Sequence, residues 1–223
     1  MISRTIPAIL CLLAAGASQS AANDDPPLGP NGTTGVEIAK DGGFEKARRY
    51  LEDGIAETPN NPVLFEYLGL AYLDCAGGID QKRCLNKAAE YMEKAISLGG
   101  RAAIVADRYA GKGGVINTIT NRGDVAGVVR GKIYIYADRV EFVPKPGSKN
   151  AETITISKAE IKDGGMGMNK AVGSTVNTFH IKVKGATFNF RTANFSADEA
   201  NLIISLVEKA QAAKAPEAKK GNE

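Results

Sequence analysis

The sequence predicts an α+β protein, in which a helical segment is followed by an antiparallel sheet and a closing helix. Three patterns support this fold class. Apolar residues recur every three or four positions between Gly43 and Gly100, they alternate from Gly131 onward, and a helical period returns after Ser196. The chain has 223 residues, of which 43% are hydrophobic and 24% are charged. This is the composition of a globular protein with one large or two small domains.

Residues 1–22 have the three-part pattern of a secretory signal peptide. Arg4 supplies a positive start, Ile6 to Ala15 is apolar, and a stretch of small and polar residues ends near Ala22. Cleavage there, or alternatively after Ala17, leaves a secreted or periplasmic chain with no transmembrane span. An uncleaved anchor is the alternative. Lipidation of Cys11 is disfavoured because no small residue precedes it.

Export leaves Cys75 and Cys84 as the remaining cysteines. In an oxidising compartment two cysteines of a small protein most often pair, so we expect a disulfide between them. A metal site is disfavoured because no other Cys or His lies nearby in the sequence, and a redox-active pair usually has the tighter C-x-x-C spacing. We expect no metal and no cofactor.

The two ends of the mature chain read as irregular. Residues 23–42 are predicted to be a flexible linker, since three prolines and three glycines lie between Asn23 and Gly35. Residues 213–223 are polar and low in apolar content, which predicts a disordered tail.

Residues 43–110 form the predicted helical domain. Helical spacing and turn residues indicate helices at Phe44–Glu57, Pro62–Asp74 and Cys84–Leu98. So few helices cannot bury a continuous core alone. We therefore expect a capping helix over Arg101–Tyr109 and packing of the helices on the second domain.

The helical segment resembles a tetratricopeptide repeat. The residues that carry the resemblance are Phe65, Leu68, Gly69, Tyr72, Ala88, Met92 and Ala95, with Ala47, Leu51, Gly54 and Pro59 as half of a preceding repeat. The connection with the cysteine pair is several residues longer than in that family. The resemblance implies a groove for a peptide or protein segment, with Tyr67 and Tyr72 as candidate lining residues, although Tyr72 also suits the core. Any amphipathic helical bundle is the alternative.

Residues 111–212 form the predicted β domain. Alternation predicts half-buried antiparallel strands around Ile133, Val140, Ile154 and Phe179. Further short strands are expected at Val115–Thr120, Ile161 and Phe188–Phe190. The terminal helix begins with a capping box, Ser196 with Glu199, and has an apolar face made of Ile203, Leu206, Val207 and Ala210.

Short strands closed by one helix resemble a pleckstrin-homology-like (PH-like) or GRAM-like domain. Residues 131–142, 179–183 and 188–190 carry the resemblance, together with the helix after Ser196. The resemblance implies a partial β-barrel capped by the terminal helix; another small barrel, or a sheet with one covering helix, is the alternative. We take Ala137–Arg139 as the first hairpin loop. It lacks the basic cluster of lipid-binding members, so phosphoinositide binding is not expected.

Charge is distributed unevenly along the chain. Residues 35–100 hold 8 basic and 11 acidic side chains, a net charge of −3, whereas residues 101–195 hold 15 basic and 7 acidic ones, a net charge of +8. On the outer strand face we expect a positive row made of Lys182, Lys184, Arg191 and His180, with His180 exposed. Such a row attracts an anionic envelope component or serves only solubility and attraction between the domains. Nucleic acid is not an expected partner.

The inventory of reactive residues is small. With a single His and no free Cys in the mature chain, the usual nucleophile–base pairs cannot be assembled. Residues 126–133 lack two determinants of a phosphate loop, and residues 164–167 lack the context of a dinucleotide motif, so both are expected to be loops or bulges. We expect no enzyme but an exported adaptor that binds a protein or peptide. Binding of anionic lipid or polymer is the alternative, and a carboxylate-dependent hydrolase is third.

Overall fold

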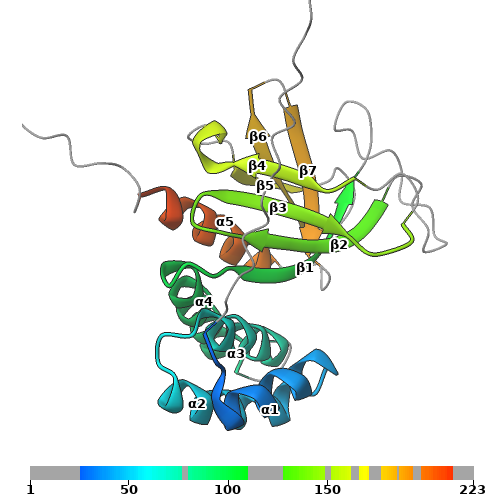
Figure 1. The fold of residues 1–223 in the computed structure, drawn as a ribbon. Coiled ribbons are helices and arrows are strands. Elements are labelled where there is room, and N and C mark those ends of the chain that lie inside the picture. Colours follow the sequence, from blue (N-terminus) through cyan, green and yellow to red (C-terminus); the bar gives the residue numbers. More distant parts are fainter. Residues whose placement is uncertain are drawn as a thin grey trace, which may run out of the picture.

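Four helices, a curved antiparallel sheet and a closing helix follow one another along the chain (Figure 1). The structure, a computed structural model, describes residues 26–76, 80–109, 128–148, 152–161, 166–170, 177–184, 186–192 and 197–212. The α+β fold class is therefore confirmed. None of the helices within these ranges is long and apolar enough to cross a membrane.

The helices predicted from periodicity are present. They are α2 (Phe44–Glu57), α3 (Pro62–Cys75) and α4 (Gln81–Ser97), preceded by α1 (Gly29–Lys40). The start of α3 is fixed locally, because the side chain of Asn61 accepts a hydrogen bond from the backbone N–H of Val63 at 2.9 Å. Helix α4 starts three residues earlier than predicted and ends before Gly99, whose φ of +85° suits glycine.

The predicted linker over residues 23–42 is wrong where α1 lies. Pro30 occupies the first turn of α1, where its missing N–H costs nothing. The glycines that suggested a linker instead allow close helix packing. A Cβ on Gly54 would lie 2.6 Å from the Cα of Gly32, and one on Gly35 would lie 2.9 Å from Leu51. Glycines that would ordinarily indicate turns therefore allow α1 and α2 to pack closely here.

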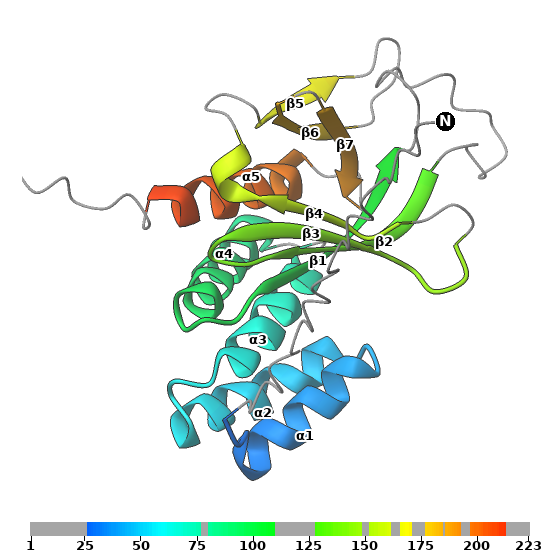
Figure 2. The ribbon, with the colours of Figure 1, turned by 45° about the horizontal axis from the view of Figure 1, so that its top comes forward.

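Among the described residues the sheet has seven strands in the order β4-β3-β2-β1-β7-β6-β5, and every neighbouring pair is antiparallel. The strands are β1 (Ala102–Tyr109), β2 (Val128–Ile135), β3 (Arg139–Pro144), β4 (Ile154–Ser157), β5 (Met166–Lys170), β6 (Asn177–Val183) and β7 (Ala186–Thr192). Strand β1 therefore sits at the centre, paired with β2 on one side and β7 on the other (Figure 2).

Residues 101–109 do not form the predicted capping helix but supply β1, so the sheet begins near Gly100 instead of at residue 111. Ala102, Ile104 and Ala106 alternate into the core. Alanine has strong helix propensity, yet here pairing on both sides decides the structure. The predicted packing of the helices on the second domain is confirmed, because α3 and α4 contact β1.

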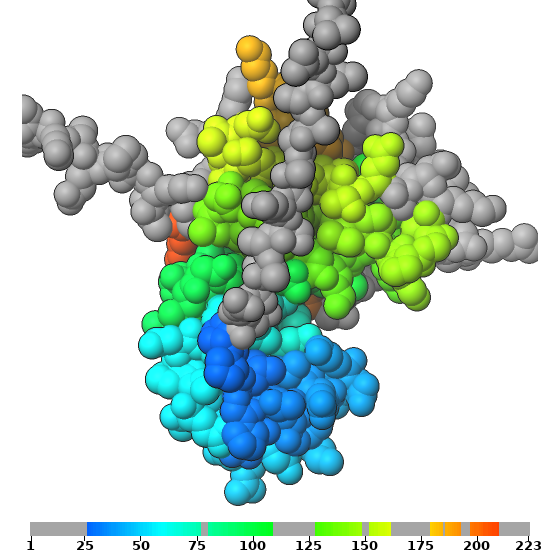
Figure 3. All heavy atoms as spheres, in the orientation of Figure 1, coloured from blue at the N-terminus to red at the C-terminus, as the bar shows by residue number. Residues whose placement is uncertain are grey.

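One core joins the helices to the sheet. Aromatic and branched side chains from the inner strand face form it, and α5 (Ala197–Ala212) covers them with Ile203, Leu206 and Val207, as predicted. Ala88, Met92 and Ile96 of α4 belong to the same core. A second, smaller core lies among α1, α2 and α3. Space-filling spheres show the helical part, blue to cyan, packed directly beneath the green strands (Figure 3).

Two further expectations for the sheet need correction. Gly131 is not in a loop but within β2, opposite Pro144, where a Cβ would lie 2.7 Å from the ring of Phe142. Ile161 is not the start of a strand that the structure describes; it follows the short helix η1 (Lys158–Glu160) and is buried. The expectations on residues 1–22, 115–120 and 213–223, and on Ser196, lie outside the described residues.

Candidate functional site

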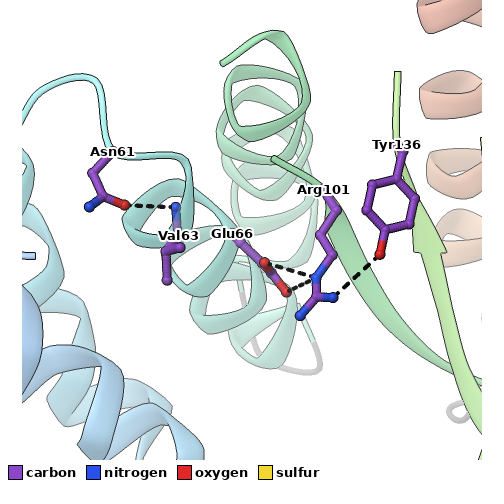
Figure 4. Close-up of polar contacts among 5 residues, drawn as sticks. All are labelled: Asn61, Val63, Glu66, Arg101 and Tyr136. Carbon is purple, nitrogen blue, oxygen red and sulfur yellow. Dashed lines mark hydrogen bonds and ion pairs between the residues drawn. The ribbon is translucent and has the colours of Figure 1, made fainter. Parts of the chain in front are cut away.

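Polar side chains link helix α3 to the sheet where the two parts meet, a region we call the joint (Figure 4). Glu66 on α3 is only 8% exposed, and both its carboxylate oxygens accept hydrogen bonds from Nε of Arg101 at 3.3 Å. Nη1 of Arg101 also donates to the hydroxyl of Tyr136 at 3.4 Å. Burial lowers the pKa of Arg101, but the hydrogen bonds and charges of Tyr136 and Glu66 outweigh it and leave that pKa raised.

Aromatic rings of β2 and its following turn extend this joint. The guanidinium carbon of Arg101 lies 4.4 Å from the ring centre of Tyr134, and that of Arg139 lies 3.9 Å from the ring of Tyr136. Tyr67 is half-buried beside Glu66, and burial raises the pKa of its hydroxyl, with charges from Glu66 and Tyr134 adding to the rise. Tyr67 also packs against the smaller core among α1, α2 and α3, and its role as a groove residue stays a prediction.

Tyr72 is a packing residue within the helical part. Its hydroxyl donates to Oε1 of Glu52 at 2.9 Å, and its ring stacks on Tyr91 with centroids 5.4 Å apart. It also contacts both hydrophobic cores. Burial and the Glu52 hydrogen bond raise its pKa. Its role as a groove residue stays a prediction, while its alternative role in the core agrees with these contacts.

Replacing Glu66 by glutamine should lower the free energy of unfolding by about 1–2 kcal/mol, because Arg101 loses a charged acceptor at a partly buried joint. Urea denaturation of both proteins measures this. Glu90→Gln is the matched control, because Glu90 is exposed and pairs with Lys87 one turn away on α4, so its loss should cost under about 0.5 kcal/mol. Equal effects of the two changes would contradict a stabilising role for the joint.

The outer sheet face carries an ion-pair cluster that sequence reasoning missed. Asp107 of β1 is 3% exposed at its side chain and lies in register between Arg130 of β2 and Arg191 of β7. Its Oδ1 accepts from Nε of Arg130 at 3.1 Å, and its Oδ2 accepts from Nε and Nη2 of Arg191 at 3.0 and 2.9 Å. The sequence shows Asp107 as an acidic residue among apolar ones, but its position between two arginines follows only from the pairing of the strands.

The predicted positive row is brought together only in part. Lys182 and Lys184 are exposed at the end of β6, but Arg191 is engaged by Asp107. His180 is not exposed as expected: it is 8% exposed and pairs across β6 and β7 with Asn189, which is also buried. Burial and the charge of Lys182 lower its pKa, which favours the neutral ring. Two of the four predicted groups thus remain open to solvent.

Lys158 is the most buried lysine that the structure describes. It lies on η1, and burial lowers its pKa to about 8, with the charge of Asp138 acting in the opposite direction. Between pH 8 and the ordinary lysine pKa of about 10.5 the unfolded chain therefore binds more protons than the folded chain. This side chain makes the folded state more stable as the pH rises through that window.

A methionine at position 158 should remove this pH dependence. At pH 7.5 the urea midpoint of Lys158→Met should therefore lie above that of the unchanged chain. At pH 10.5 the difference between the two midpoints should be smaller. Lys182→Met, at an exposed position, is the control and should differ from the unchanged chain equally at both pH values. A constant difference for Lys158→Met would show that Lys158 titrates as in the unfolded chain.

Cys75 and Cys84 form the predicted disulfide, with their Cα atoms 5.9 Å apart. The bond ties the end of α3 to the first turn of α4. Near this tie, Nε2 of Gln81 donates to Oδ2 of Asp198 on α5 at 3.2 Å. The start of α5 is thereby linked to the helical part.

Two hollows adjoin this region. The larger, about 640 Å³, is a groove between α4 and α5, lined among others by Leu85, Asn86, Ala89, Asn201, Leu202 and Ser205. The smaller, about 200 Å³, lies where α2, α3, β1 and α5 converge. Within the described residues no group of three or more His, Cys, Asp or Glu side chains is arranged to hold a metal ion.

Comparison with known proteins places few constraints on function. No protein-family model matches the chain, and no match was found among curated proteins. Among solved structures, the N-terminal PH domain of human ARAP2 is similar, with 12% sequence identity and a TM-score of 0.35 over 56% of this chain and 90% of that domain. A likeness this slight assigns neither a family nor an activity.

Proposed function

We propose that the chain is an exported, non-catalytic adaptor that binds a protein or peptide partner. The observation that carries this proposal is the groove between α4 and α5, which is walled by one helix from the helical part and by the closing helix of the sheet. A surface made jointly by two parts of a chain is a common position for a binding site.

The dimensions and chemistry of the groove suit a short extended segment. Polar bridges close both its ends, Gln81 to Asp198 and Lys209 to Glu93. The 12 residue steps from Gln81 to Glu93 rise by about 18 Å, the length of about five extended residues. Leu85, Ala89 and Leu202 supply an apolar floor, and the carboxamides of Asn86 and Asn201 can donate to and accept from a peptide backbone.

The arrangement of elements supports two interaction modules. The sheet is compatible with the PH-like resemblance in its strand order. Strand β1 pairs with both β2 and β7, and a terminal helix follows the last strand. The close approach of α3 and α4 is compatible with the tetratricopeptide resemblance, since a Cβ on Gly69 would lie 2.7 Å from Met92. Both modules typically present surfaces to partners.

Export and the absence of catalysis are part of the same proposal. The Cys75–Cys84 bridge suits an oxidising compartment, and the signal-type residues 1–22 suit secretion or a periplasmic location.

The basic sheet face is a weaker candidate for binding anionic lipid or polymer, since Asp107 engages two of its arginines. PH-like lipid binders use the first hairpin loop. With β1 at residues 102–109 this loop is 110–127, outside the described residues, and not 137–139 as assumed from the sequence.

Affinity capture from an envelope or secreted fraction of the source organism tests the adaptor role. The mature chain should retain a protein that Ala89→Arg, which fills the groove floor, fails to retain. Ser97→Arg, on an exposed position of α4 outside the groove, is the matched control and should retain it. Capture of no protein, or equal capture by both variants, would contradict binding through the groove.

A further inference from the structure

The smaller hollow, which we call the junction pocket, is lined by Phe44, Leu70, Leu73, Asp74, Ile104, Val105 and Glu199. These residues come from α2, α3, β1 and α5, so the pocket exists only because the helices dock on the sheet. Its volume of about 200 Å³ lies below the roughly 300–1,000 Å³ of sites that enclose whole small molecules. A single long side chain is the better match to this volume.

The walls of the pocket are apolar. Leu70 and Leu73 lie on successive turns of α3, and Ile104 of β1 belongs to the main core behind them. Val105 is 40% exposed. Among the residues that the structure describes, it is the one large hydrophobic residue that is exposed. An apolar ligand group that covers these side chains would be favoured by burial.

The exposed charge among the residues that line the pocket is acidic. Asp74 is exposed, and no lysine, arginine or histidine is among the lining residues. Glu199 is 5% exposed and lies in the first turn of α5. Asp74 is also in the last turn of α3, which ends at Cys75, and the carbonyl end of a helix carries partial negative charge. The exposed carboxylate of Asp74 and the C-terminus of α3 therefore favour a cation on this side of the pocket.

We propose that the junction pocket binds a lysine or arginine side chain presented by the protein partner. The long aliphatic stem of such a residue would cover the apolar walls, while its charged end would reach the exposed carboxylate of Asp74. This inference rests on the proposed adaptor function and names a feature of the partner: a segment with a basic residue beside apolar ones, which would also contact Val105.

Peptide titration followed by NMR of methyl-labelled mature protein tests the pocket directly. The probe is acetyl-Ala-Leu-Lys-Ala-amide, compared with peptides that carry norleucine or glutamate in place of lysine. The lysine peptide should shift the methyl signals of Leu70, Leu73 and Val105 in a saturable way and bind at least about threefold more tightly than the norleucine peptide. Equal binding of the lysine and norleucine peptides, or no shift at these methyls, would overturn the proposal.

Two charge variants separate a local effect from bulk attraction. Asp74→Lys should weaken the lysine peptide at least about threefold, whereas Asp53→Lys, an equal change at an exposed position of α2 outside the pocket, should leave its affinity unchanged. Equal weakening by both variants would overturn the proposal. A last control tests whether the chain's own Lys214, Lys219 or Lys220 occupies the pocket. If changing these lysines to glutamine shifts the pocket signals without any peptide, the proposal of a partner's side chain is overturned.

The titration and the affinity capture can fail independently. If the mature chain and Asp74→Lys capture the same partner equally well, the pocket is not the site of a basic anchor, although the adaptor role stands. If no partner is captured at all, the adaptor role fails, and the peptide titration still decides whether the pocket selects a cation.

Discussion

Replacing Phe190 by alanine is expected to lower the free energy of unfolding by about 3–5 kcal/mol, the largest effect of any single change considered. Phe190 is 1% exposed, and its ring centre lies 5.5 Å from that of Phe179 and 5.7 Å from that of Phe142. It joins β7 and β6 to β3 across the curved sheet. Its removal therefore leaves a cavity between both halves of the sheet, which the surrounding strands can refill only in part.

Thermal and urea denaturation measure this effect, with Thr187→Ala on the exposed part of the same strand as the control. The control should stay within about 0.5 kcal/mol of the unchanged chain. Because α4 shares the core with the sheet, loss of helical and sheet signals should coincide in Phe190→Ala. A loss below about 1 kcal/mol would contradict the packing described for this ring.

Breaking the Cys75–Cys84 disulfide is expected to cost about 2–3 kcal/mol, since the bond closes a loop of about ten residues and restrains the unfolded chain. The Cys75→Ser, Cys84→Ser double variant should melt about 5 °C or more below the oxidised chain. The start of α4 and its Gln81–Asp198 contact lie beside this loop, so hydrogen exchange should increase first in that region.

A reducing agent supplies the control for the disulfide. It should lower the melting temperature of the unchanged chain to that of the double variant and leave the double variant unaffected. A double variant as stable as the oxidised chain would show that the bond adds nothing beyond the packing of α3 against α4.

Much of the architecture follows from local pattern in the sequence. Phe44 to Glu57 is predicted as a helix with the bounds that the structure has, because its apolar residues keep one helical face. The strands around Ile133, Phe142 and Phe179 follow from alternation, and the closing helix from its buried face at Ile203 and Val207. The cysteine pair follows from the expected compartment.

Two elements escaped prediction because tertiary contact decides them. Gly32 and Gly35 read as linker residues, yet they occur where α1 touches Leu64 and Leu51 too closely for a side chain. The alanines of 102–106 favour a helix locally, yet the segment pairs with strands that come 22 and more residues later in the chain. Neither outcome has a signal within a short window of sequence.

The candidate site was harder to predict than the fold for the same reason. Tyr67 was chosen from the repeat resemblance, and sequence could not show that the charge of Arg101, from outside the helices, would influence its pKa. Asp107 became visible only when strand register set it between two arginines. The groove between α4 and α5 joins segments more than 100 residues apart, so no local pattern could have revealed it.

The most direct test of where a partner docks is site-specific photo-crosslinking in the mature chain. A benzoylphenylalanine at Asn86, on the rim of the α4–α5 groove, should cross-link to one protein of the native envelope or secreted fraction. The same group at Lys182, on the exposed sheet face, should not. Cross-links from position 182 with none from position 86 would contradict the account and move the docking surface to the basic sheet face.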